Sequence, residues 1–264
     1  MDPFSRIASE GVLLVGGAAA ILLQVSHPLV AAGVAEHSDF RRDPVARLRG
    51  TLGYVYAQAS GDAELAAATT ALVARAHAPV RREHSDARPG YSADDPELQF
   101  WVVATLYRTA DVIARAVLDP LDEAEADAVY AGYARLGTAL GMPAERWPSD
   151  RAAFQREWTA QLSRLSVGDE ARGIARDLLH PERPLLLRPL MPLVRLVTPA
   201  LLPTGPRREF GLRHGPVRAR IVHAGARAMR VLWPRLPRTV RTLPQRIVLR
   251  GLRRHLAGRS APLG

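Results

Sequence analysis

Apolar residues recur every three or four positions along most of the chain, and no segment keeps the strict alternation typical of a half-buried strand. A helix gathers such positions on one face, so the pattern predicts a protein built from amphipathic helices. The predicted helices span residues 5–25, 28–37, 44–60, 63–78, 95–118, 122–140, 150–166 and 168–180. We therefore expect an all-α, single globular domain with its core in residues 1–180.

Capping residues set several of these boundaries. Asp95 precedes a proline, which is typical of the first helical position. Asp122 and Glu125 have the spacing of a capping box. Ser149 is the predicted cap of the next helix, and Gly141 is predicted to end the one before it.

The pattern changes after His180, where prolines interrupt any long helix. Beyond them, basic amphipathic helices are predicted at residues 216–233 and 244–257. Residues 181–264 are too rich in Leu, Val and Ile for a disordered tail. We expect them to form a basic helical cap that packs on the same domain.

Charge is distributed unevenly along the chain. Residues 1–150 hold 13 arginines against 20 acidic residues, whereas residues 151–264 hold 23 arginines against 6. The basic part could contact an anionic membrane peripherally, with Trp233 at the interface. It could instead pair with the acidic half, within one molecule or across a homodimer. Nucleic acid is not an expected partner, because prolines disrupt any recognition helix and stacking aromatic residues are scarce.

Composition restricts the metal chemistry. The 264-residue chain contains no cysteine, and it has 36 arginines but no lysine. Disulfides, thiolate-bound zinc, iron–sulfur clusters and covalently attached haem are therefore excluded. Any metal must be bound by His, carboxylate or Tyr side chains.

An apolar run from Val12 to Val25 is the best candidate for a membrane or targeting segment. It is 14 residues long, against the roughly 20 that span a bilayer. Two acidic residues precede it and no small-residue cleavage site is evident, so a signal peptide is not expected. We expect a buried helix in a cytoplasmic protein.

Polar residues gather on one face of the predicted helix at 44–60. Arg47, Thr51, Tyr54 and Gln58 follow one another at helical spacing beside an apolar stripe. The spacing alone favours a solvated face with a partly packed Tyr54, and a site for a metal-centred cofactor is the alternative. A buried polar group without a partner costs about 1–3 kcal/mol, so inward-facing members of the row would need a ligand.

His77 is the candidate metal ligand. It ends the predicted helix at 63–78, with Pro79 two residues later. Neutral imidazole is a common haem ligand, and the end of a helix can direct it towards a cofactor. A satisfied structural histidine is the alternative. His27 and His37 are expected to bond carbonyls at helix ends, and His84 is expected to be exposed.

Several segments together resemble the MpaB and latex-clearing-protein (rubber oxygenase) family. They are HPLVAAGVAEHSDFRRDPVARLRGT, the later HAPV, and GYSADDPELQFWVVATL. The resemblance covers about residues 10–160, and LLPTGPRREFGL more loosely. It implies an all-helical, globin-like core around a non-covalent haem b.

The same resemblance implies roles for individual residues. His77 would be the proximal haem ligand, with Arg47 and Thr51 beside the haem and Tyr54 among the cofactor-binding residues. Glu36 is a candidate for the distal acid, so Arg47, Thr51 and Glu36 form the expected catalytic set. Gly50 stands where rubber oxygenases have a lysine that can cap the iron, which implies a distal side that is open or covered by another group.

A pocket segment and an activity follow from the resemblance as well. Tyr91, Asp95 and Trp101 would shape the pocket wall. The expected activity is haem-dependent oxygenation of an apolar, isoprenoid or lipid-like substrate, with O2 inserted at or cleaving a C=C bond. A non-catalytic haem- or lipid-binding protein with a basic membrane-binding surface is the alternative.

Overall fold

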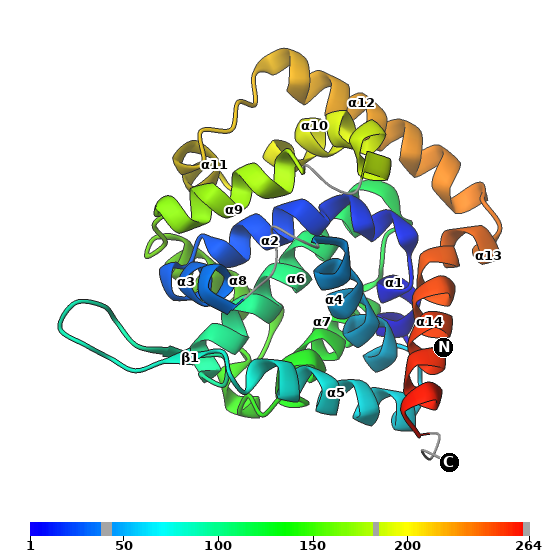
Figure 1. Cartoon of the computed structure of the whole chain (residues 1–264). Helices are drawn as coiled ribbons and strands as arrows, with labels where there is room; N and C mark the ends of the chain where they lie inside the picture. The colour runs from blue at the N-terminus through cyan, green and yellow to red at the C-terminus, as the bar shows by residue number, and fades with distance from the viewer. Residues whose placement is uncertain (38–43, 182–184, 261–264) are drawn as a thin grey trace.

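The computed structural model is a bundle of helices with one short hairpin (Figure 1). It describes residues 1–37, 44–181 and 185–260, excluding the side chains of residues 44–47, 185–187 and 259–260. The α-helices in these ranges are α1 (Pro3–Ala8), α2 (Gly17–Val25), α3 (Pro28–His37), α4 (Pro44–Gln58), α5 (Ala63–His77), α6 (Pro96–Val117), α7 (Glu123–Thr138), α8 (Arg151–Leu162), α9 (Asp169–Leu179), α10 (Met191–Leu201), α11 (Thr204–Glu209), α12 (Pro216–Leu232), α13 (Arg238–Arg241) and α14 (Leu243–Ser260). The all-α prediction is confirmed.

Short elements join these helices. The 3-10 helices are η1 (Gly11–Gly16), η2 (Ala144–Arg146), η3 (Leu185–Leu190) and η4 (Trp233–Arg235). The strands β1 (Arg81–Arg82) and β2 (Tyr91–Ser92) pair antiparallel, with Arg81 opposite Ser92. The globin-like arrangement and the division at residue 180 stay predictions.

The core is built around α2 and α6. Both helices bury most of their apolar residues, and α6 packs against α2, α7 and η1. Trp101 on α6 is 1% exposed, and its Nε1 donates to the backbone oxygens of Leu23 (3.1 Å) and Gln24 (3.2 Å). Its ring stacks on Trp158 of α8 with centroids 5.2 Å apart. Trp101 therefore fixes α2, α6 and α8 to one another.

Most predicted boundaries hold to within three residues, and two details are wrong. The segment 5–25 is not one helix, since it divides into α1, η1 and α2. The cap of α8 is Asp150 rather than Ser149, because the Asp150 carboxylate accepts from the backbone N–H of Ala153. The capping box of Asp122 and Glu125 is confirmed.

Helices of the C-terminal segment contact the helices of the core. Helix α10 contacts η1 and α2, α12 contacts α6, and α14 contacts α4. In Figure 1, α12, α13 and α14 follow one edge of the molecule in that order. Within the described ranges, no single helix has the length and apolarity to cross a bilayer; Gly11–Val25 and Pro28–His37 pass that test only as a pair bent by 106°.

Candidate functional site

Helices α4 and α5 form the antiparallel pair that carries most of the predicted site. Asp62 caps α5 by accepting from the backbone N–H of Leu65 at 3.0 Å. Near the turn, the Gln58 Nε2 donates to the Thr70 Oγ1 at 2.9 Å and so joins the two helices. Figure 1 shows α4 and α5 diverging from this turn, so that the pair opens towards Pro44 and His77.

Tyr54 lies in the packed half of α4. Its side chain is buried, and its hydroxyl donates to the backbone oxygen of Leu136 on α7 at 2.7 Å. Burial raises the pKa of Tyr54 well above its ordinary value. The hydroxyl thus satisfies a main-chain carbonyl and fixes α4 on α7, which is a structural use. A cofactor contact by Tyr54 stays a prediction.

The N-terminal half of α4 has an uncovered face. Thr51 is exposed and Leu48 is 38% exposed, although Tyr54 and Val55, one turn later, pack on the core. No described atom lies within 4 Å of where a side chain on Gly50 would begin. On α2, a Cβ atom added to Gly17 would lie 3.9 Å from the Leu48 Cδ1. The uncovered face therefore begins beside the N-terminus of α2.

Arg47 belongs to the first turns of α4. Its backbone is helical, which puts it one turn before Thr51, on the same face. Its side chain lies outside the described residues. The predicted Arg47–Thr51 row is thus confirmed for the backbone alone.

His77 is the last residue of α5. The helix ends there because Ala78 makes the final bond, to the Ala74 oxygen, and Pro79 has no N–H to continue. The backbone N–H of Val80 then bonds the His77 carbonyl at 2.8 Å and turns the chain towards β1. The side chain is half-buried. His77 and Thr51 therefore sit on different arms of the diverging pair.

Glu36, the candidate distal acid, lies at the end of α3 against the β1–β2 hairpin. Its carboxylate accepts from the Tyr91 hydroxyl at 2.7 Å and pairs with Arg82 and, at 3.4 Å, with Arg88. The Arg82 guanidinium also lies 4.8 Å from the centroid of the Tyr91 ring. The carboxylate thus fastens the hairpin to α3.

The Glu36 contacts give a testable pH dependence. The hydrogen bond from Tyr91, followed by the charges of Arg82 and Arg88, lowers the pKa of Glu36 below 4.5. A depressed carboxyl pKa means that this stabilisation is complete above the unfolded value and is lost as pH falls through the folded value. We expect Tyr91→Phe to raise the Glu36 pKa towards 4.5 in an NMR titration. An unchanged pKa would contradict the assigned bond.

The three residues expected in a pocket wall have structural contacts. Tyr91 is buried and anchors the hairpin through Glu36, and its pKa is raised to about 12, chiefly by burial. Asp95 caps α6 by accepting from the backbone N–H of Glu97 at 2.8 Å. Trp101 is core. Each contact is intramolecular, so a role in ligand binding stays a prediction for all three.

His27 differs from its expected role. We predicted that its imidazole bonds a free carbonyl at the helix end, but its Nδ1 is buried without a hydrogen-bond partner in the described structure. Burial lowers the pKa of His27, against the opposing charge of Asp95. Sequence reasoning missed this orphaned nitrogen, and the only local signal was a histidine inside an apolar run. The predicted exposure of His84 is confirmed.

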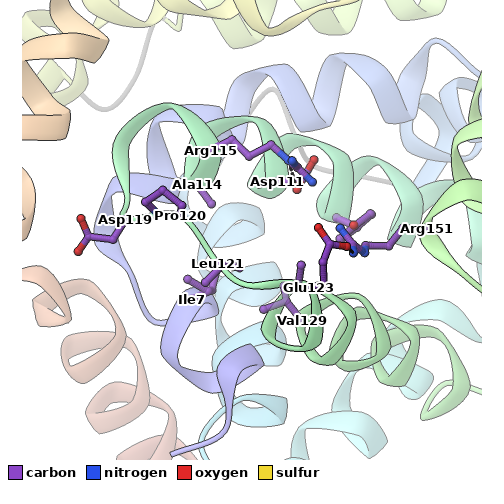
Figure 2. Close-up of a pocket in the computed structure, with 12 residues that line it drawn as sticks. Ile7, Asp111, Ala114, Arg115, Asp119, Pro120, Leu121, Glu123, Val129 and Arg151 are labelled. Carbon is purple, nitrogen blue, oxygen red and sulfur yellow. Dashed lines mark hydrogen bonds and ion pairs between the residues drawn. The ribbon is translucent and has the colours of Figure 1, made fainter.

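A cavity of about 140 Å³ lies between the end of α6, the start of α7 and Ile7 of α1 (Figure 2). Drug-sized ligands occupy pockets of roughly 300–1,000 Å³. Arg115 pairs with Asp111 at 2.8 Å, and Arg151 pairs with Glu123 and Asp127. A more open hollow of about 330 Å³ adjoins it and shares these arginines. Among the residues that the structure describes, no predicted site residue lines either cavity.

The donor set near α4 and α5 fits a haem in kind. A haem can be held by one axial imidazole together with apolar surface around the ring, and here His77 ends one arm while the exposed apolar side chain of Leu48 lies on the other, beside Thr51. Among the described residues, no group of three or more His or carboxylate side chains could hold a bare metal ion. A haem does not require such a group, because a single protein ligand can hold its iron.

Comparison with known proteins gives the family. Two uncharacterized mycobacterial proteins, Rv2237 of Mycobacterium tuberculosis and Mb2261 of Mycobacterium bovis, are each 36% identical over 172 residues, covering 62% of this chain and 67% of theirs. No solved structure matches the chain. Residues 5–233 match the family described as "ER-bound oxygenase mpaB/B'/Rubber oxygenase, catalytic domain". The chain belongs to this MpaB and rubber oxygenase family.

Proposed function

We propose that this protein is a haem-dependent oxygenase that acts on an apolar alkene of isoprenoid or lipid-like character. The observation that carries the proposal is that an oxygenase-family chain places a half-buried imidazole, His77, and an uncovered hydroxyl, Thr51, on the diverging arms of α4 and α5. An oxygenase without cysteine must bind any haem through another donor, and His77 offers one.

His77, Arg47 and Thr51 would have separate roles in binding the cofactor and the substrate. His77 would hold the haem, and Arg47 on the other arm would pair with a carboxylate of the cofactor through its planar guanidinium. When bound, the haem supplies the binding and activation of O2 that protein side chains lack. Thr51 would orient a water molecule or a polar group of the ligand.

The substrate would be held mainly by burial of apolar surface. Leu48 presents exposed apolar area beside Thr51, and each buried CH₂ group of a substrate contributes about 0.8 kcal/mol. Cleavage of a C=C bond by O2 breaks that bond and places one oxygen atom on each carbon. The products are two carbonyl groups, so the overall reaction consumes no external reductant.

A non-catalytic haem or lipid carrier is the second candidate. It is supported by Glu36, whose carboxylate is already engaged by Tyr91, Arg82 and Arg88. A carboxylate held at lowered pKa is a weaker proton acceptor, so a role as catalytic base is less favoured than a structural one. A haem carrier would bind the same cofactor as the oxygenase and differ from it in turnover, whereas a lipid carrier would bind no haem.

Pigment analysis with an oxygen electrode tests both. Protein supplied with haem during expression is expected to show a Soret band and about one iron per chain, and to consume O2 when squalene is added. Carbonyl products should appear in step with O2 uptake. A band without squalene-dependent uptake would favour the carrier. The absence of any band after haem supply would contradict both the oxygenase and the haem carrier, and it would favour a lipid carrier.

A further inference from the structure

Helix α12 presents an apolar row to solvent. Residues Val217, Ile221, Ala224, Ala228, Val231 and Leu232, named here the outer stripe, follow one another at helical spacing, and all are exposed. Ile221 is 51% exposed and Leu232 is 56% exposed. Isolated apolar side chains on a surface are ordinary, but a continuous stripe of this length marks an interaction site.

The opposite face of α12 is the one that packs on the protein. Val222, Ala226 and Met229 are half-buried, and α12 contacts α6 and α10. Met229 packs against the main core cluster. The outer stripe is therefore not a misplaced core face, because the helix already has one apolar face in use.

Arginines border the outer stripe. Arg220 and Arg227 follow one edge at a spacing of seven residues, and Arg218 lies on the other edge. Residues 216–256 contain 11 arginines and no acidic residue. In the described structure only Arg241 and Arg253 of these pair with a carboxylate, that of Glu10 and of Asp62.

The exposed apolar row continues past α12. Leu236, Val240, Leu243 and Ile247 are all exposed, and Arg246 and Arg250 are exposed beside the last two. In Figure 1, α13 and α14, which carry the last three of these apolar residues, extend the same edge of the molecule as α12. The apolar and cationic positions thus recur along one side of the protein.

We propose that this edge, formed by the outer stripe and its flanking arginines, docks on an anionic lipid bilayer. An amphipathic helix with arginines beside an apolar row lies in a membrane interface with its apolar side chains among the acyl chains. Anionic head groups supply the charges that nine of the arginines lack. The predicted interfacial residue Trp233 is not part of this surface, since its Nε1 donates to the buried Glu10 at 2.8 Å.

Other occupants fit the surface less well. A second copy docked through the outer stripe would bring two rows of unpaired arginines together, and like charges repel. Nucleic acid would neutralise the arginines, but it offers no apolar phase to cover Ile221 and Val231. A bilayer with anionic head groups satisfies both the charge and the apolar surface.

Vesicle flotation of the full-length protein tests the proposal, and it needs no haem. The protein is expected to float with phosphatidylcholine vesicles that contain phosphatidylglycerol, and not with phosphatidylcholine alone. Each cation near an anionic surface contributes about 1 kcal/mol, so Arg220→Gln with Arg227→Gln should weaken binding about 30-fold. Ile221→Asn with Val231→Asn should weaken it at unchanged net charge.

The control is a second pair of arginine substitutions, which removes the same charge at positions outside the proposed docking surface. Arg156→Gln with Arg176→Gln removes the same charge from exposed positions on α8 and α9 and should leave vesicle binding unchanged. If the two double arginine variants lost vesicle binding equally, the proposal would be overturned, because net charge alone would explain the binding. A wild-type dimer that Ile221→Asn dissociates, or tighter binding to duplex DNA than to anionic vesicles, would overturn it as well.

Discussion

His77→Ala is expected to abolish the Soret band of the haem-supplied protein and, with it, squalene-dependent O2 uptake. The imidazole would be the one protein bond to the iron, so its removal would leave the cofactor held only by apolar contacts and by the pair with Arg47. Loss of a residue that merely supports a metal ligand already lowers affinity 10–100-fold, and loss of the ligand itself should exceed that range. Absorbance spectra at matched protein concentration measure the effect.

Two further variants separate ligation from damage to the fold. His84→Ala removes an exposed histidine from the neighbouring hairpin and should leave the band unchanged. His77→Gly leaves space for free imidazole, and adding imidazole to the buffer should restore the band. A normal band in His77→Ala with an unchanged far-ultraviolet spectrum would refute the assignment of His77.

Arg241→Ala is expected to lower the free energy of unfolding by about 3–5 kcal/mol, the usual result of leaving one partner of a buried ion pair alone. Glu10 is 2% exposed, and its carboxylate accepts from the Arg241 guanidinium and from the Trp233 Nε1. Without Arg241 the charge stays buried with one donor. Urea unfolding followed by circular dichroism measures the loss.

Milder changes should give smaller losses. Glu10→Gln keeps an acceptor for Trp233 and removes the buried charge, so a cost of about 1–3 kcal/mol is expected. Arg253→Ala breaks the more exposed pair with Asp62 and should lower the free energy of unfolding far less than Arg241→Ala does. If Arg241→Ala costs no more than Arg253→Ala, the pair with Glu10 does not stabilise the fold.

The helices could be predicted because their signals are local. The Asp122–Glu125 box and the stop at Gly141, which has φ +98°, act within a few residues of the chain. The apolar run after Glu10 was wrongly predicted as part of one continuous helix. Apolar spacing is also a local signal, and it does not distinguish the 3-10 turns of η1 from an α-helix. Local patterns therefore gave the fold class and most boundaries, but missed a break.

Contacts between residues far apart in the chain could not be predicted from the sequence. Nothing near Tyr54 in the sequence indicates that its hydroxyl bonds Leu136, and nothing near Trp233 indicates that it faces Glu10. These pairs are 82 and 223 residues apart, and they exist only after helices pack. Helical spacing correctly put Arg47 and Thr51 on one face, yet whether core, solvent or ligand covers that face depends on tertiary packing.

The Glu10 contacts also bear on the timing of synthesis. Gly11 lies under the C-terminal segment, with its Cβ position 2.8 Å from the Arg241 oxygen, and Glu10 beside it depends on Trp233 and Arg241. Ribosomes add about 5–20 residues per second, so these partners emerge many seconds after the N-terminus. Until Trp233 and Arg241 have been synthesised, the Glu10 carboxylate lacks both donors, so its burial as an ion pair can only follow the synthesis of α13.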